Sequence, residues 1–122
     1  MTLPAIPGAS ATNTITIRPQ ASATALTISS NNTGAVLDLN GGNYYILDGR
    51  PGGTGTVKQL TISNTGTNGA AVLFVNEGSN NTLRYLTLTG GSTLATVGVA
   101  TFGTTTGANG NDNNLIDNCD IR

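Results

Sequence analysis

Six carboxylate side chains are the residues of this sequence with the clearest capacity for chemistry. They are Asp38, Asp48, Glu77, Asp112, Asp117 and Asp120. Hydrolysis of a glycosidic bond needs two carboxylates that flank the scissile bond. The strand pattern separates Asp38 from Asp48, and Asp48 in its tight Asp-Gly-Arg turn is better interpreted as a turn residue that binds the following backbone amides. The sequence therefore predicts no catalytic residue and no enzyme.

The sequence also gives little support for a metal site or a cofactor site. The chain has no histidine and a single cysteine, Cys119, which excludes an intramolecular disulfide. Calcium takes about six or more oxygen ligands, and the loop at 107–114 offers one acid among Asn and Gly residues. Asn and Gly adopt left-handed turn conformations readily, which explains this loop without a metal. We expect no metal and no cofactor.

A charged column is predicted at Lys58, Arg84 and Asp117. Each of these residues stands two positions before an apolar residue in a repeated stretch of sequence. Stacked strands lie about 4.8 Å apart, so Arg84 and Asp117 are predicted to form a surface pair. Such a pair contributes roughly 0 to 1 kcal/mol and would help to set the register.

A row of hydroxyl side chains is predicted on one outer face. It consists of Thr27, Thr61 and Thr87 with their neighbours Ser29, Ser63 and Thr89. A regular threonine array of this kind could order water, so ice binding is one hypothesis. The alternative is that Thr is a good strand former on a solvated face. Asp120 and Arg122 interrupt the row in its fourth repeat.

Asparagines that precede strands could form a ladder of side-chain amides. The candidates are Asn43, Asn81 and either Asn113 or Asn114. Each amide would donate a hydrogen bond to the next repeat, which is a structural role.

The positions of these side chains are set by four similar stretches of sequence, at 24–29, 58–63, 84–89 and 117–122. The stretches are spaced by about 30 residues. Alternation of apolar and polar residues puts two apolar side chains of each stretch on one side. The predicted core ladder is Leu26, Ile28, Leu60, Ile62, Leu86, Leu88, Cys119 and Ile121. Repeats of this size built from strands predict a β-solenoid.

Two further strands accompany each of these stretches and give every coil three faces. On the first face, the side chains predicted to point inward are Ile15 and Ile17, then Tyr45, Leu83 and either Leu115 or Ile116. On the third face, the side chains predicted to point inward are Leu37, Leu73 and Val99. Because each strand's neighbour is the same face one coil later, the sheets must be parallel. We predict an all-β, three-faced parallel solenoid of about four coils, a single domain with an entry strand or tail at 1–12 and coils at 13–122.

Composition agrees with a thin tube and excludes some partners. The chain has no Trp, five aromatic residues and 17 glycines, which suits small stacked cores and many turns. A net charge of −1 with 9% charged residues excludes a basic surface for nucleic acid. No apolar run reaches membrane-spanning length. The aromatic residues predicted to point outward are Tyr44 and Phe74, with Tyr85 less clearly so.

The run NYYILDGRPGGTGTVKQLTISNTGTNGAAVLFVNEGSNNTLRYLTLTG, continued by GNDNNLIDNCDIR, resembles the right-handed parallel β-helix repeats of secreted bacterial proteins, especially large Bacteroidetes surface proteins. The resemblance covers about residues 13–122. It implies a right-handed helix and an extracellular or cell-surface location. The β-helix class includes pectate lyases, polysaccharide hydrolases, tailspikes, adhesins and stalks, so the resemblance leaves activity open.

The two ends of the tube are predicted to be apolar and uncovered. The residues concerned are Leu3, Ile6, Ile15, Cys119 and Ile121. If 3–6 is a third-face strand, the chain makes a whole number of turns and could continue in the next copy, forming a filament. We therefore hypothesise a non-enzymatic structural module that stacks end to end or belongs to a surface stalk or adhesin. The alternative hypothesis is a module that binds or cleaves carbohydrate, with a surface glycan as its partner.

Overall fold

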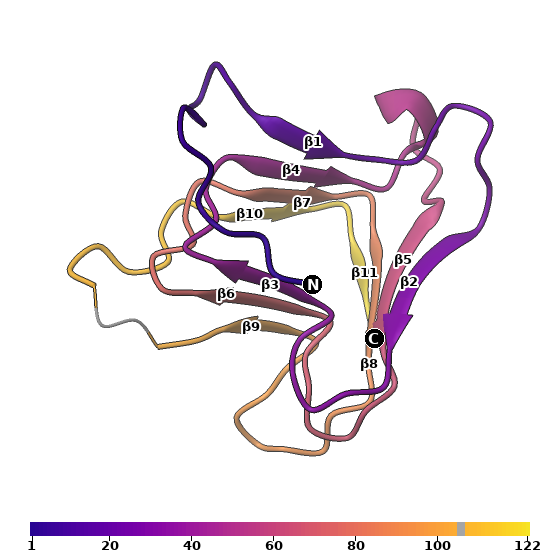
Figure 1. The fold of residues 1–122 in the computed structure, drawn as a ribbon. Coiled ribbons are helices and arrows are strands. Elements are labelled where there is room, and N and C mark those ends of the chain that lie inside the picture. Colours follow the sequence, from indigo (N-terminus) through magenta and orange to yellow (C-terminus); the bar gives the residue numbers. More distant parts are fainter. Residues whose placement is uncertain (105–106) are drawn as a thin grey trace.

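Three parallel sheets build the fold in the computed structural model, which describes residues 1–104 and 107–122. The first sheet contains β1 (Ile15–Ile17), β4 (Tyr45–Asp48), β7 (Thr82–Arg84) and β10 (Leu115–Asp117). The second contains β2 (Leu26–Ser30), β5 (Leu60–Asn64), β8 (Thr87–Gly90) and β11 (Asp120–Ile121). The third contains β3 (Leu37–Asn40), β6 (Val72–Val75) and β9 (Ala100–Phe102). Figure 1 shows the sheets as three sides of a tube.

Every strand pairs with the strand three positions along the chain, because successive coils repeat the same three faces. The predicted all-β, three-faced parallel solenoid is confirmed. Among the described residues the helical content is one 3-10 turn, η1 (Pro51–Gly53). None of the described residues belongs to a helix long and apolar enough to cross a lipid bilayer.

The prediction of about four coils was slightly too high. Strands β1 to β9 complete three turns, and β10 and β11 begin another. The extra coil was counted from a third-face strand at 3–6. In its place the chain makes an isolated parallel bridge between Thr2 and Asp38, and the amide of Leu3 donates to the carbonyl of Asp38 at 2.7 Å. Pro4 follows and lacks the amide that a longer ladder would need.

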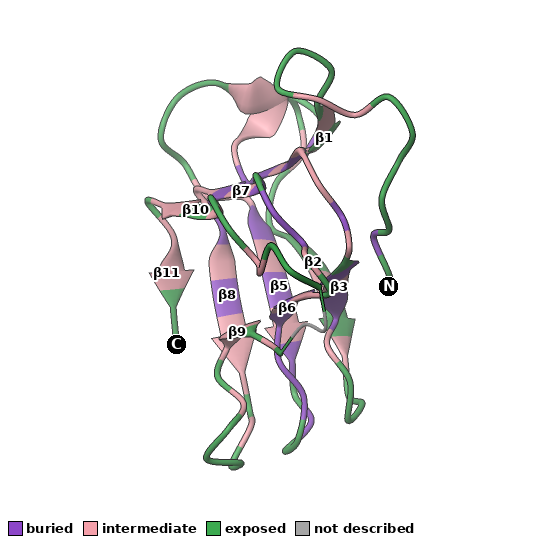
Figure 2. Cartoon of the chain, turned by 90° about the vertical axis from the view of Figure 1, so that its left-hand side faces the viewer, coloured by how far each residue is buried: buried purple, intermediate pink, exposed green. Residues whose placement is uncertain are grey.

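The interior of the tube is one apolar cluster fed by all three sheets. Its fully buried members include Leu37, Leu39, Leu47, Ile62, Val72, Phe74, Leu83, Leu86 and Leu88. Figure 2 shows that buried segments lie in the middle strands of the sheets and in the turn after β5, whereas many of the other turns are exposed. Stacked aliphatic side chains fill a thin tube without large aromatic residues, as the composition indicated.

On the third face, the inward-pointing residues of β6 are shifted by one position from the prediction. The register pairs Leu37 with Val72 and Leu39 with Phe74, so Val72 and Phe74 point inward. Leu73 pairs with Asp38 on the outer side, and Val99 lies just before β9. A shift of one residue exchanges the two sides of a strand. The prediction that Phe74 points outward was therefore wrong.

Two of the repeated stretches each divide between two faces. Tyr85 lies between β7 and β8 with a φ of 51°, and Asn118 lies between β10 and β11 with the same φ. The left-handed backbone at these positions turns the chain from the first sheet into the second. Arg84 and Asp117 therefore belong to the first face, and the apolar residues that follow the corners belong to the second.

Candidate functional site

Asp48 is the centre of a charged cluster on the first sheet. Its carboxylate is fully buried at the end of β4. Arg50 donates to it from Nε at 2.9 Å and from Nη2 at 2.8 Å, and Arg84 donates from Nε at 2.9 Å. The backbone amide of Arg50 also donates to Oδ1 at 3.1 Å. Asp48 thus has the turn role that the sequence indicated, and it also joins two coils.

The environment of Asp48 keeps its carboxylate charged. Burial opposes ionisation, but the side-chain and backbone hydrogen bonds from Arg50 and the charges of Arg84 and Arg50 outweigh it and lower the pKa from 3.8 to about 2. The guanidinium of Arg50 also lies over the ring of Tyr85, 4.6 Å from its centroid. These contacts consume the hydrogen-bonding capacity of the acid, so the cluster holds coils together and offers no free carboxylate for hydrolysis.

The predicted surface pair between Arg84 and Asp117 is not formed. The register does place Asp117 beside Arg84, but the guanidinium of Arg84 turns to Asp48 in the preceding coil, with Nη2 2.9 Å from Oδ2. A buried carboxylate is the stronger partner because it is shielded from solvent. Asp117 instead accepts a hydrogen bond from the side chain of Asn118 at 2.8 Å.

Lys58 does not belong to the column in which it was predicted. The turn from Gly49 to Gln59 separates it from the first face, where Asp48 occupies the position next to Arg84. The ammonium of Lys58 binds Asp120 at 2.5 Å, and this hydrogen bond lowers the pKa of the Asp120 carboxyl. Asp120 also lies 3.8 Å from the guanidinium of Arg122. The prediction placed Lys58 by counting back two residues from the inward Leu60. That count was misleading because the insertion after Asp48 makes the corner before Leu60 longer than the corner before Leu86.

The hydroxyl row lies on the outer side of the second sheet. Register pairs Thr27 with Thr61 and Thr61 with Thr87, and Asp120 follows in the last coil. The adjacent row runs through Ser29, Ser63 and Thr89. The row is three coils long, and the ion pair of Asp120 closes it at one end. Ice binding remains a prediction from the sequence.

The amide ladder has two members. Asn81 donates from Nδ2 to Oδ1 of Asn114 at 3.0 Å, and its own Oδ1 accepts from the amide of Tyr45 at 2.9 Å. Asn43 lies outside this ladder. The register that pairs Ile46 with Thr82, extended by one residue, places Tyr45 beside Asn81, and Asn43 precedes Tyr45 by two residues. The Oδ1 of Asn43 accepts from the amide of Ser79. Sequence analysis did not single out Asn64, which is buried and donates to the carbonyls of Gly34 and Ala70.

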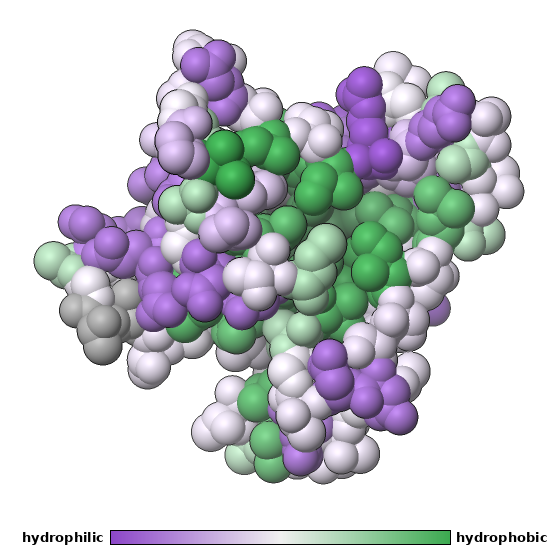
Figure 3. Space-filling view, in the orientation of Figure 1, coloured by the Kyte–Doolittle hydropathy of each residue, from purple (hydrophilic) through white to green (hydrophobic). Residues whose placement is uncertain are grey.

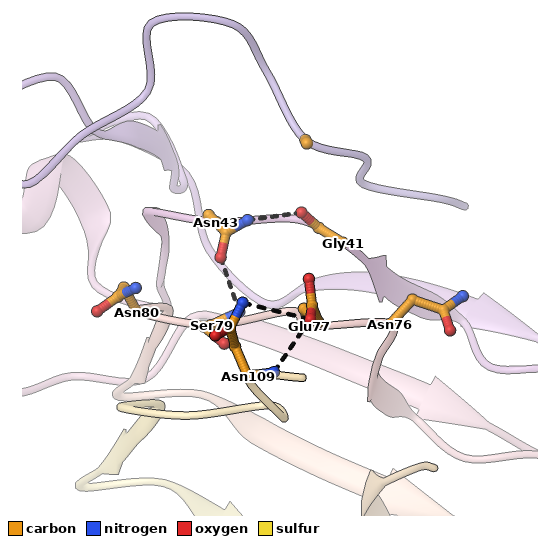
Figure 4. A pocket seen from close by; sticks show the side chains of 8 residues that line it. Gly41, Asn43, Asn76, Glu77, Ser79, Asn80 and Asn109 are labelled. Atoms are coloured by element: carbon orange, nitrogen blue, oxygen red, sulfur yellow. Dashed lines mark hydrogen bonds between the residues drawn. The ribbon is translucent and has the colours of Figure 1, made fainter. Parts of the chain in front are cut away.

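A polar pocket of about 480 Å³ opens beside these turns. It is lined by Ala5, Gly41, Asn43, Asn76, Glu77, Ser79, Asn80 and Asn109. Figure 4 shows Asn43 joined to Ser79, and Asn109 joined to Glu77. The backbone amide of Asn109 donates to Oε1 of Glu77 at 3.1 Å. Small-molecule sites are generally lined by apolar and aromatic side chains. The described lining has no aromatic residue, so the pocket gives no particular support to a glycan site.

The two end coils carry the remaining feature of note, which is exposed apolar surface. At one end Leu26 is 43% exposed and Ile6 is 45% exposed. At the other end Phe102 is 52% exposed, Leu115 is 53% exposed and Ile121 is 51% exposed. In the middle coils the residues in the same columns as Leu26, Ile121 and Phe102 are buried, namely Leu60, Ile62, Leu86, Leu88 and Phe74.

Phe102 and Ile121 are continuous with the core, whereas Leu115 pairs with Thr82 in the outward column of the first sheet. The ring of Phe102 stacks on Phe74 with centroids 4.6 Å apart. Ile121 pairs in register with Leu88. Figure 3 shows apolar residues gathered within the ring of strands at the end that carries β1. An apolar hollow there is lined by Ile17, Arg18, Pro19, Leu26, Thr27, Ile28 and Leu60.

The residues predicted at the assembly ends occupy different environments. Ile6 and Ile121 are exposed, while Ile15 and Cys119 are half-buried and pack against the core. Leu3 is buried, because its amide and that of Asp38 join the N-terminal segment to β3. The N-terminal segment therefore pairs with the outer edge of β3, and core columns meet solvent at other positions of the end coils, such as Leu26, Phe102 and Ile121.

Comparison with family models, curated proteins and solved structures found no match to this chain. The class to which it belongs, a parallel β-solenoid, is defined by its fold. Its predicted likeness to Bacteroidetes surface proteins remains a resemblance noted in the sequence.

Proposed function

We propose that this chain is a non-enzymatic structural module of an extracellular or cell-surface assembly, and that its end coils bind the end coils of further copies. The observation that supports this function is the axial exposure of the core columns. Phe102 is 52% exposed and Ile121 is 51% exposed at the last described strands of the third and second sheets, whereas their column neighbours Phe74 and Leu88 are buried. A neighbouring solenoid offers the complementary surface, with open strand edges and the same three faces.

The energetics require more than the apolar contacts. Fully burying a large apolar side chain contributes about 1.5 to 3 kcal/mol, so each half-exposed residue contributes about 1 kcal/mol. Association costs an estimated 4 to 15 kcal/mol in lost motion. Backbone hydrogen bonds between the end strands must therefore add to the contact, which extends the ladders already present between coils. We expect association that depends strongly on concentration.

A concentration series of the purified chain tests the function. Sedimentation velocity and negative-stain microscopy should show oligomers that lengthen as concentration rises. Ile121→Lys and Phe102→Lys should both reduce association, because each places a charge on an axial surface. Val57→Lys is the matched control, since Val57 is 59% exposed in the lateral turn after η1. A chain that stays monomeric at every concentration, or equal loss with all three variants, would contradict the proposal.

A further inference from the structure

The outer side of the first sheet carries charges that alternate in sign along the tube axis. Asp48 pairs in register with Arg84, and Arg84 pairs with Asp117. Arg18 and Asp48 directly follow the paired residues Ile17 and Leu47, so Arg18 begins the same column. The order from one end of the tube to the other is positive, negative, positive, negative.

The inner members of this column are paired, and its two ends are not. Asp48 binds Arg84 within the tube. Arg18 is exposed, and within residues 1–104 and 107–122 neither Arg18 nor Asp117 forms a salt bridge. The guanidinium of Arg18 lies over η1, where a Cβ at Gly53 would be 2.6 Å from its Nη1. One end of the tube thus presents a cation, Arg18, and the other a carboxylate, Asp117, at the same position on the same face. Asp117 accepts a hydrogen bond from Asn118, but among the described residues neither charge forms a salt bridge.

We propose that Asp117 of one copy pairs with Arg18 of the next copy, with β10 of the first running parallel beside β1 of the second. The inference rests on the proposed end-to-end function and specifies its polarity and register. The pair repeats between molecules the contact that Arg84 and Asp48 make between coils. Charge complementarity of this kind selects partners and orientation more than it adds affinity.

The same register also matches the apolar columns across the junction. It places Ile116 over Ile17 and Ile121 over Ile28, because these residues belong to shared columns within the molecule. It likewise places Phe102 over Leu3, since Leu3 follows the bridge between Thr2 and Asp38.

Other arrangements lose this match. A slip of one residue would turn the inward side chains of one strand against the outward side chains of the other. A contact between two β1 ends or between two β10 ends would run the facing strands antiparallel, so the parallel register of the columns would be lost. It would also bring together two surfaces that both carry Arg18 or both carry Asp117, with no opposite charge to pair. The second copy therefore docks head to tail.

Charge reversal at each end tests the pair. Arg18→Asp and Asp117→Arg should each weaken self-association by at least about tenfold, because each creates a like-charge contact at every junction. An equimolar mixture of the two variants should recover association to within about threefold of the wild type, because every junction between unlike variants again joins opposite charges. Sedimentation velocity measures both, and far-UV circular dichroism checks that each variant is folded.

Matched controls and neutral variants complete the design. Thr67→Asp and Thr67→Arg alter the charge of an exposed turn in a middle coil and should leave association unchanged. Should Asp117→Arg fail to fold beside Arg84, Arg18→Gln and Asp117→Asn remove the charges without repulsion and should each weaken association by roughly twofold to fivefold.

The outcomes separate this inference from the proposed function. If the wild type remains monomeric, both are overturned. If the wild type associates and the end variants associate equally well, or if the mixture of reversed variants does not recover, the charge pair is overturned and end-to-end stacking stands. Loss in each variant with recovery in the mixture supports the pair.

Discussion

Removing the charge of Asp48 should make the stability of the protein less dependent on acid. Asp48→Asn keeps the size of the side chain but leaves two guanidinium groups without their shared carboxylate. Arg50 and Arg84 have side chains that are 16% and 35% exposed, so water reaches them only in part. Breaking a buried ion pair by removing one partner costs about 3 to 5 kcal/mol. Because both arginines retain some solvent, we expect a loss of about 3 kcal/mol at pH 7.

The dependence on pH has a defined sign and size. The pKa of Asp48 is about 2 in the folded protein and 3.8 ordinarily, so it is depressed by folding. A depressed acid stabilises the folded state fully above the ordinary value, and this stabilisation declines as pH falls through the folded value. At about 1.4 kcal/mol for each pH unit, the contribution is about 2 kcal/mol. The difference between wild type and Asp48→Asn should therefore shrink from about 3 kcal/mol at pH 6 to about 1 kcal/mol at pH 2.

Urea unfolding at a series of pH values measures this difference. Circular dichroism near 218 nm follows strand content and needs no tryptophan, which the chain lacks. Asp112→Asn is the matched control, because Asp112 is exposed in a turn and its substitution should change the free energy of unfolding by less than about 0.5 kcal/mol. Parallel curves for wild type and Asp48→Asn between pH 5 and pH 2 would refute the role given to the ion cluster.

Four further substitutions examine the core, the amide ladder and a corner. Phe74→Ala should lower the free energy of unfolding by about 3 to 5 kcal/mol because its ring is fully buried, whereas Phe102→Ala should cost about 1 kcal/mol. Asn81→Ala should cost about 2 to 3 kcal/mol because it leaves the buried amide of the preceding coil without an acceptor. Gly49→Ala should also destabilise, by several kcal/mol, because a Cβ there would overlap the backbone carbonyl of Tyr85. Urea unfolding followed by circular dichroism measures all of them.

A control and contrary results can be specified for these substitutions as well. Asn68→Ala changes an exposed asparagine in a turn and should be nearly neutral. Equal losses for Phe74→Ala and Phe102→Ala would contradict the burial described for the third sheet. A cost for Asn81→Ala no larger than that for Asn68→Ala would show that the ladder contributes little, and a stable Gly49→Ala variant would contradict the tight corner.

Local pattern was enough to predict the second sheet. Leu60, Ile62, Leu86 and Leu88 alternate with polar residues, and all four are buried in the structure. Alternation reports which side of a strand faces the core, because successive side chains point in opposite directions. The order of faces along the chain is also local information, so the parallel solenoid followed from the sequence.

Register on the third face was decided by the tertiary structure. The run Ala71 to Val75 is apolar throughout, so alternation could not distinguish Leu73 from Phe74. Pairing with β3 chose Phe74 for the interior. In a strand without polar residues, the neighbouring coil supplies the missing information.

The charged column shows the same division between local and tertiary information. Each of its members directly follows an inward apolar residue, namely Ile17, Leu47, Leu83 and Ile116, and this signal was present in the sequence. Alignment on the second face obscured it, because the corner after Asp48 is longer than the corner after Arg84. Sequence by itself determined the strands, their order and the chemistry of their side chains. Only the folded chain decided which charges meet, because turn length and backbone pairing set the stacking of one coil on the next.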